Sequence, residues 1–391
     1  MSSINRKIRV MHVAQAAGGV DRYLRCLVKY LNHDKFENIL VCSQDFVSEN
    51  YKGIVDKFET VIMQRSIGLH DFQAISSVRK LIKKYTPDIV YAHSSKAGAI
   101  VRIANVGIKK LCVYNPHGWS FNIIGSWKKQ IAYSLMEKVM APFADVIVCI
   151  SDAEKNSALD KHICSEKKLH VIFNGIDIQE YETSSHGKKK RSDIGIPENA
   201  LVVGMVGRLV PQKSPDIFIR MAKKVKKEIR DAHFIITGDG YMKETIEKYA
   251  EKYGFEKDVH ITGWVDNPLD YIELFDIAVL LSRWEGFGLV IPEYMICQKT
   301  IVATMVDAIP NLLEDHVNGL LVPPENPQAA YEAILEIYND AKLVDRIIEQ
   351  GLEDVYKKYD ARRVSKEHEI LFEKIMNSFG NEEDLGYKRL L

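Results

Sequence analysis

Short apolar runs alternate with longer amphipathic segments along almost the whole chain. KIRVMHVA at 7–14 and DIVYAH at 88–93 are typical of buried strands, and DRYLRCLVKYLN at 21–32 has helical spacing. This alternation indicates parallel sheets covered by helices on both faces. A polar, basic stretch at 183–193 interrupts the pattern, which then starts again with ALVVGMVG at 200–207.

A chain of 391 residues is too long for one comfortable hydrophobic core, so we predict two domains. They span 1–185 and 186–360, and a terminal helical segment follows at 361–391. Each domain is expected to be an α/β, Rossmann-like, doubly wound parallel sheet. Because ligands bind beyond the carboxyl ends of such strands, the two domains should face a central cleft, with the chemistry on loops that follow strands.

The overall charge is balanced, with 53 basic and 53 acidic side chains. A dedicated nucleic-acid binder would usually be basic, so that class is disfavoured. The two halves differ, however: residues 1–183 carry 25 Lys/Arg and 18 Asp/Glu, a net of +7, and the remainder has a net of −7. The asymmetry is either ordinary variation between solvated surfaces or the mark of an N-terminal half that faces an anionic partner, such as a phospholipid surface.

The six cysteines show neither CxxC nor metal-ligand spacing, and we expect free thiols in a reducing compartment. The first residues contain no apolar segment long enough for a signal peptide, and no run approaches 18 apolar residues. We therefore expect a cytoplasmic protein, with the inner face of the membrane as a further location to test.

The most informative motif is DIAVLLSRWEGFGLVIPEYMICQ at 276–298, where a strand, a glycine-rich loop and a helix follow one another. The loop carries Glu285-Gly286-Phe287-Gly288, and the helix begins near Leu289. Glycines allow the backbone to approach a ligand, and a helix N-terminus offers N–H groups to phosphate. Glu293 follows Glu285 by eight residues. Either glutamate alone is more often structural or solvated, but the whole arrangement favours a phosphate-bearing ligand.

A second motif, VVGMVGRLVPQKSPD at 202–216, places Arg208 and Lys213 on a loop between a strand and a helix. A diphosphate leaving group needs cations at such a place. The chain contains no D-x-D sequence, so we expect fixed cations and helix dipoles, with no metal cofactor, to neutralise the departing charge.

The remaining candidates follow strands of the first domain. Gly18 and Gly19 open a helix after the first strand, which suits either phosphate approach or a tight turn. His117 in NPHGW and, less strongly, His93 in AHSSKAG end strands at the expected ligand face. The nearest dinucleotide pattern, Gly238-Asp239-Gly240, has Lys243 at its third position, which disfavours an NAD-linked enzyme.

Seven motifs together resemble the family-4 retaining glycosyltransferases of the GT-B fold. In chain order they are GGVDRYL, HSSKAG, NPHGWSF, FNGID, GRLVPQK, EGFGLVIPE and VNGLLVPPENP. The resemblance spans nearly the whole chain, and its specificity comes from the combination. It implies a last helix that packs back on the N-terminal domain. It also implies the roles that follow for individual residues.

By this resemblance, Glu285 lies near the donor sugar, Glu293 on the ribose, Arg208 and Lys213 on the diphosphate, Gly19 near the phosphates and His117 near the transferred sugar. We assign catalysis to His117, Glu285, Arg208 and Lys213. Donor binding is assigned to Gly18, Gly19, Arg208, Lys213, Gly286, Phe287, Gly288, Leu289 and Glu293.

The family often has a G-G-x-P-E turn after the TIVAT-like strand. Here the turn reads Asp307-Ala308-Ile309-Pro310-Asn311, without either glycine and without the glutamate. We expect this departure to influence which sugar or base is accepted.

The leading hypothesis is transfer of a hexose or N-acetylhexosamine from a UDP-sugar to a glycan or lipid-linked acceptor in surface polysaccharide biosynthesis. A nucleotide-sugar epimerase of the same fold and a non-catalytic nucleotide-sugar-binding partner are the alternatives. The segment 119–140 is either a buried helix or a contact with an anionic lipid interface, because it contains aromatic, aliphatic and basic residues, namely Trp119, Phe121, Ile123, Ile124, Trp127, Lys128 and Lys129.

Overall fold

The computed structural model describes residues 6–15, 17–64, 66, 68–123, 125–183, 189–265 and 267–384, and of 379–384 only the backbone. The chain divides into two compact units, one formed by Met1–Gly175 with Ala361–Leu391 and the other by Ile176–Asp360. The second unit thus begins about ten residues before the predicted boundary at 186. The backbone N–H of Ile176 donates to the Tyr359 carbonyl (2.8 Å), and the Tyr356 hydroxyl donates to Glu182 (2.8 Å), which ties 176–183 to the second unit.

The first unit is built on a parallel sheet that, over the residues described, has seven strands in the order β3-β2-β1-β4-β5-β6-β7. Its strands are β1 Ile8–Ala14, β2 Phe36–Cys42, β3 Lys57–Thr60, β4 Ile89–His93, β5 Leu111–Asn115, β6 Val146–Cys149 and β7 Leu169–Val171. Its helices are α1 Gly19–Tyr30, α2 His70–Tyr85, α3 Ser95–Ala104, α4 Trp127–Met140, α5 Asp152–Asp160 and α14 Ala361–Asp384.

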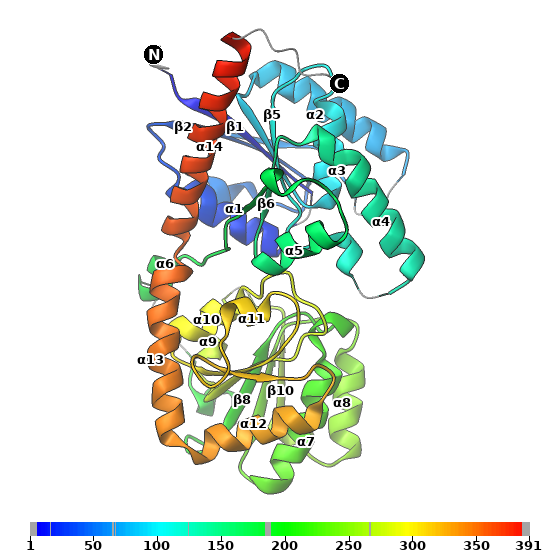
Figure 1. Ribbon diagram of the computed structural model, residues 1–391. Coiled ribbons are helices and arrows are strands. Elements are labelled where there is room, and N and C mark those ends of the chain that lie inside the picture. Colours follow the sequence, from blue (N-terminus) through cyan, green and yellow to red (C-terminus); the bar gives the residue numbers. More distant parts are fainter. Residues whose placement is uncertain are drawn as a thin grey trace. The chain divides into compact units, whose positions relative to one another are not determined.

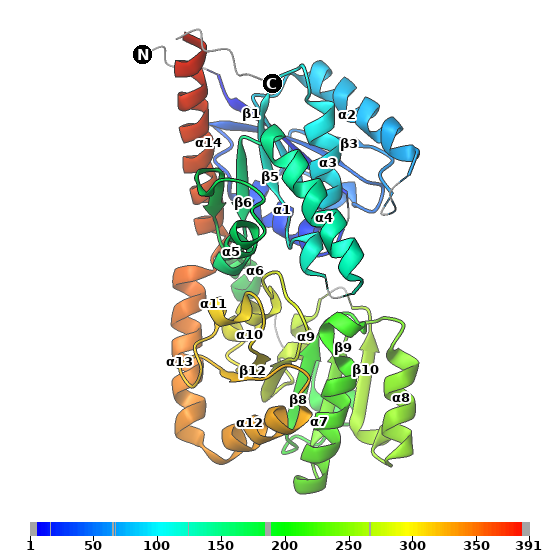
Figure 2. The ribbon, with the colours of Figure 1, turned by 45° about the vertical axis from the view of Figure 1, so that its right-hand side comes forward.

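The strands of this sheet are apolar on both faces because helices cover both (Figures 1 and 2). Met11 and Val13 of β1 pack in a core with side chains of α2, α3 and α5. Val10 and Ala14 point the other way, into a core formed with α1 and α14. Helix α14 lies along α1, and the Ser365 hydroxyl donates to the Leu27 carbonyl (2.9 Å).

The second unit repeats the plan with six described strands, all parallel, in the order β10-β9-β8-β11-β12-β13. They are β8 Val202–Val206, β9 His233–Thr237, β10 Val259–Gly263, β11 Ile277–Leu280, β12 Thr300–Thr304 and β13 Leu320–Val322. The helices are α6 Ile178–Thr183, α7 Pro215–Glu228, α8 Lys243–Lys252, α9 Leu269–Ile272, α10 Val290–Ile296, α11 Ile309–Leu312, α12 Pro327–Asn339 and α13 Ala341–Lys358.

Strand order reverses at one place in each sheet, between β1 and β4 in the first unit and between β8 and β11 in the second. At such a switch point, neighbouring crossovers leave on opposite faces and open a crevice beyond the carboxyl ends of the two strands. In the second unit the loops that leave this point carry Arg208 and Lys213 after β8 and Glu285 after β11. In the first unit Gly18 follows β1, and His93 ends β4.

The structure corrects the expected lipid-facing set in 119–140. Trp119 and Phe121 are buried, each 2% exposed, and their rings stack on one another at 5.2 Å between centroids. Trp127 and Ile123 are exposed, whereas Ile124 lies outside the described residues. Among the helices that the structure describes, none is long and apolar enough to cross a membrane. Part of the polar stretch at 183–193, residues 184–188, is also outside the described ranges.

Candidate functional site

Lys213 and Glu285 form an ion pair at the switch point of the second sheet. Lys213 ends the 3-10 turn Pro211–Lys213 that follows β8, and its ammonium donates to the Glu285 carboxylate. The two side chains are only 15% and 10% exposed. Since a partly buried charge is costly without a partner, the pairing offsets the cost of placing both charges at the edge of the sheet.

Three further hydrogen bonds hold the Glu285 loop in place. The Ser282 hydroxyl donates to Glu285 Oε2 (3.1 Å), and the Thr304 hydroxyl donates to the Ser282 carbonyl (2.6 Å). The backbone N–H of Glu285 donates to Asp307 Oδ2 (2.8 Å). Burial, together with the charge of Glu285, raises the pKa of Asp307.

Asp307 belongs to the turn that departs from the family pattern. It stands where that pattern has its first glycine, and its φ of 43° lies in the left-handed region that favours glycine and tolerates aspartate. The departure therefore replaces a side-chain-free position with a carboxylate that anchors the Glu285 backbone.

Arg283 joins the loop after β11 to the loop after β8. Its guanidinium donates to both carboxylate oxygens of Asp216 (2.8 and 3.0 Å) and to the Pro211 carbonyl (2.7 Å). Its backbone N–H donates to the Gln212 carbonyl (2.8 Å). Burial alone would raise the pKa of Asp216, but the Arg283 guanidinium outweighs it and the pKa is lowered. The two loops that carry Lys213 and Glu285 thus behave as one unit.

The other predicted donor residues of the second unit lie close to Lys213 or Glu285 in the sequence. Arg208 is exposed and donates to the Gln212 side chain (3.2 Å). Gly288 has a φ of 90°, and Leu289 is the N-cap of α10. Phe287 and Glu293 are buried. Helix α10 is tied to β8, because the Val206 backbone N–H donates to the Tyr294 hydroxyl (2.9 Å).

Gly238 and Gly240 have a packing role that explains the weak dinucleotide pattern. A Cβ on Gly238 would lie 2.0 Å from the Gly207 carbonyl oxygen, and one on Gly240 would lie 2.4 Å from that of Leu209. The backbone after β9 therefore supports the loop that carries Arg208.

In the first unit, the half-buried His117 ends a chain of fully buried side chains that runs across the strands. His93 Nδ1 lies 3.1 Å from His117 Nε2, His12 Nδ1 lies 3.3 Å from His93 Nε2, and Asn38 Oδ1 lies 3.3 Å from His12 Nε2. Burial lowers the pKa of His12 to about 4 and of His117 to about 3, and that of His93 well below its ordinary value.

All three rings are neutral at pH 7, and a neutral imidazole has one donor and one acceptor nitrogen. With the Asn38 oxygen as acceptor, each ring carries its proton on Nε2, and His117 Nδ1 is left as an acceptor. A second branch of this histidine network joins Tyr23 and Tyr91 to His368 on α14, with both hydroxyls within 3.0 Å of His368 Nε2. The Tyr23 ring meets that of His117 edge-on at 4.6 Å.

Glu154 holds the backbone around His117. Its carboxylate accepts the backbone N–H groups of Gly118 (2.7 Å) and Ile150 (2.6 Å), and burial raises its pKa to about 7. Ser151 caps α5 by accepting the Glu154 N–H (3.1 Å). His117 itself has a φ of 51°, so this loop is strained backbone under tight local control.

Gly18 is the N-cap of α1, with a φ of 105° and no side-chain capping bond. A Cβ on Gly18 or Gly19 would meet nothing within 4 Å, so packing does not explain these glycines. In FNGID, Asp177 Oδ1 accepts the Glu180 N–H (3.2 Å) at the start of α6.

The sequence alone does not show how the two regions are organised. Arg283 is a single polar residue with ordinary neighbours, and the sequence marks Asp307 only as part of the departing turn. Their roles depend on contacts between residues 72 and 22 positions apart. His12 is a polar residue inside an apolar strand, and its buried position could be predicted from that pattern.

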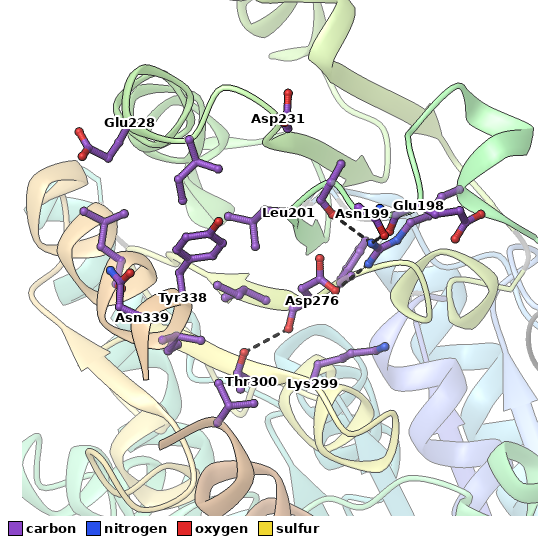
Figure 3. A pocket seen from close by; sticks show the side chains of 18 of the residues that line it. Glu198, Asn199, Leu201, Glu228, Asp231, Asp276, Lys299, Thr300, Tyr338 and Asn339 are labelled. Atoms are coloured by element: carbon purple, nitrogen blue, oxygen red, sulfur yellow. Dashed lines mark hydrogen bonds and ion pairs between the residues drawn. The ribbon is translucent and has the colours of Figure 1, made fainter. Parts of the chain in front are cut away.

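An open depression of the second unit lies at the amino ends of the strands (Figure 3). Leu201, Asp276 and Lys299, which precede β8, β11 and β12, are among its lining residues. Thr300 donates to the Asp276 carbonyl (3.1 Å) there. The predicted donor residues of this unit follow the opposite, carboxyl ends of its strands.

Two protein-family profiles match the chain: "Glycosyltransferase Family 4" over residues 17–180 and "Glycosyl transferases group 1" over 187–354. Among curated proteins, the chain is 27% identical over 352 residues to the Escherichia coli UDP-Gal:alpha-D-GlcNAc-diphosphoundecaprenol alpha-1,3-galactosyltransferase, covering 88% of this chain and 91% of that protein.

The chain is also 25% identical to the Staphylococcus aureus poly(ribitol-phosphate) alpha-N-acetylglucosaminyltransferase, over 86% of this chain and 64% of that protein. Among solved structures, Anabaena HepE in complex with UDP-glucose has a TM-score of 0.82 at 22% identity, covering 94% of this chain and 99% of that one. This last likeness bears on the fold.

Replacing Asp307 with alanine should lower kcat for donor turnover about 10-fold, because one hydrogen bond that fixes the Glu285 backbone is lost. Asp307→Asn keeps an acceptor oxygen of the same reach and should restore most of the rate. Steady-state kinetics on both variants measures this. Equal losses in the two variants would show that the carboxylate charge, and not the hydrogen bond, is what matters.

Lowering the pH from 7 to 5 should destabilise the first unit. The folded-state pKa values of His12, His117 and His368, about 4, 3 and 4, lie below the ordinary value of 6.5. Unfolded chains therefore take up protons first, and stability present above pH 6.5 is lost as the pH falls towards 4. Glu154, with its raised pKa, acts in the opposite sense. We expect a net loss of roughly 2–5 kcal/mol.

Urea unfolding at several pH values measures how the free energy of unfolding changes with pH. His12→Gln should make this dependence on pH weaker, and Glu154→Gln should make it stronger. A stability that does not change between pH 7 and 5 would contradict a neutral, buried histidine network.

Proposed function

Because the chain belongs to the family-4 glycosyltransferases of the GT-B fold, we propose that it transfers a hexose or N-acetylhexosamine from a UDP-sugar to a lipid-linked or glycan acceptor, with retention of configuration. The family assignment supports a function in sugar transfer, in biosynthesis of the polysaccharide type. The donor, the acceptor and the stereochemical course are the proposal.

The observation that carries the proposal is the joined pair of loops at the switch point of the second sheet. Transfer breaks the bond between the anomeric carbon and a phosphate oxygen, and the electron pair leaves with UDP. Lys213 and Arg208 supply cations on one loop for that growing negative charge, and Glu285 supplies a carboxylate on the other for the positive charge of the sugar. The acceptor hydroxyl oxygen then bonds to the anomeric carbon, and its proton passes to the departing diphosphate oxygen.

The ion pair holds the Lys213 and Glu285 side chains together before the donor arrives. An ammonium has three donors, so Lys213 can keep its bond to Glu285 while it meets a phosphate oxygen. Arg283 and Asp307 hold both loops in place, so little reorganisation is needed when charge develops.

The donor and acceptor classes are supported by similarity. The Escherichia coli relative is named for UDP-Gal and a GlcNAc-diphosphoundecaprenol acceptor, and the Anabaena neighbour was crystallised with UDP-glucose. By analogy we propose a UDP-sugar donor and an acceptor on a lipid carrier. Retention is supported by the family resemblance of the motifs.

Incubation with a panel of UDP-sugars, without acceptor, should release UDP slowly from one of them. Arg208→Ala and Lys213→Ala should each lower this rate about 10²–10³-fold, the usual cost of removing one group that stabilises developing charge. Lys248→Ala, a change of the same kind at an exposed position of α8, serves as control. We expect EDTA to have little effect, since the proposal assigns no metal.

Other results would replace the proposal. Conversion of the donor to another sugar nucleotide would identify an epimerase, and tight binding with no turnover would identify a non-catalytic partner. Activity that disappears with EDTA and returns with Mn²⁺ would overturn the metal-free assignment.

A further inference from the structure

Helix α4 turns its apolar side chains to solvent. Trp127, Ile131, Leu135 and Val139 recur every fourth residue and are 64%, 57%, 60% and 59% exposed. At 3.6 residues per turn, this spacing places the four on one side of the helix. A surface helix of a globular protein normally buries such a stripe.

A buried ion pair fixes this orientation. Glu137, on the inner side of α4, accepts from Arg102 Nη2 (2.9 Å) and from the Tyr114 hydroxyl (2.8 Å). The Arg102 and Glu137 side chains have no solvent exposure. Rotating α4 to bury its apolar stripe would break this pair and leave an uncompensated buried charge, which is strongly unfavourable. The stripe is therefore held outward by the core of the first unit.

The charges on the exposed side of α4 all have one sign. Lys128, Lys129 and Lys138 are exposed, whereas the one acidic residue of the helix, Glu137, is buried. Two of the lysines lie in the first turn, where the helix dipole disfavours cations, so helix stability does not explain them. The Lys128 ammonium lies 5.8 Å from the centre of the Trp127 ring.

We propose that this surface, the α4 face, docks on an anionic lipid bilayer. It is formed by Trp127, Lys128, Ile131, Leu135, Lys138 and Val139. Apolar side chains with an aromatic residue enter the boundary between headgroups and acyl chains, and lysines stay at the level of the phosphates. A second copy of the chain fits less well, because a two-fold contact through α4 would bring lysines against lysines.

The proposal does not depend on the reaction that the protein catalyses. It assigns a lipid-binding role to a surface outside the predicted catalytic and donor residues. It also replaces Trp119 and Phe121, which are buried, with Ile131, Leu135 and Val139 as the groups that meet lipid.

Flotation with phosphatidylcholine vesicles, with and without about 30 mol % phosphatidylglycerol, tests the α4 face. The full chain should float with the anionic vesicles at low salt, should float far less with neutral ones, and should lose most binding in about 0.5 M NaCl. Trp127→Gln/Leu135→Gln should lower the partition coefficient at least about 10-fold. Lys128→Glu/Lys138→Glu should lower it by more than about 25-fold, since each lysine contributes about 5-fold.

Matched controls separate the α4 face from general charge and hydrophobicity. Trp264→Gln removes another exposed tryptophan, and Lys223→Glu/Lys227→Glu removes the same charge from α7. Both should float like the unmodified protein, and all variants should retain UDP-sugar turnover without acceptor. Equal flotation with neutral vesicles, equal losses in the controls, or a concentration-dependent dimer that Leu135→Gln abolishes would each overturn the proposal. No flotation at all would do the same, whatever the outcome of the activity assays.

Discussion

The ion pair between Lys213 and Glu285 is the interaction on which the site of the second unit depends. A largely buried charge is costly without a partner, so the two loops that carry these groups must be held at a fixed separation. Arg283 keeps this separation fixed by bonding to Asp216 and to the carbonyls of the preceding loop. Asp307 contributes by accepting a hydrogen bond from the Glu285 backbone. The strand order then places both loops at the switch point, where ligands of doubly wound sheets bind.

In the first unit, uncharged buried polar groups fix the surroundings of His117. The histidine network spans from Asn38 through His12 and His93 to His117, and each step is a hydrogen bond between uncharged partners. Each of these bonds restricts the ring that it reaches, so the network orients His117 through residues that lie far from it in sequence. The same unit uses Arg102 and Glu137 to fix the rotation of α4, so a buried charge decides which side chains face outward.

The fold was largely predictable because most strands of both sheets are buried on both faces, and their continuous apolar runs are easy to recognise. The short strands β3 and β7 were missed, since four and three residues carry little pattern. Glycine-flanked Glu285 and the loop cations were predicted from the positions they hold after strands. Arg283, Asp307 and the inner side of α4 could not be, because their roles arise from contacts between distant segments. Trp119 was assigned to the surface from its type, yet Glu154 and the ring of Phe121 hold it inside.

The central claim is that the carboxylate on the loop acts on the reacting sugar while the one on α10 binds the nucleotide. Calorimetric titration of UDP into Glu285→Gln and Glu293→Gln, combined with donor kinetics, tests it most directly. A ribose does not change during transfer, so its contact affects KM and UDP affinity, whereas a contact that strengthens at the sugar affects kcat. The account predicts that Glu285→Gln keeps its UDP affinity and loses kcat, and that Glu293→Gln loses UDP affinity with a smaller change in kcat. Loss of UDP affinity in Glu285→Gln alone would contradict it.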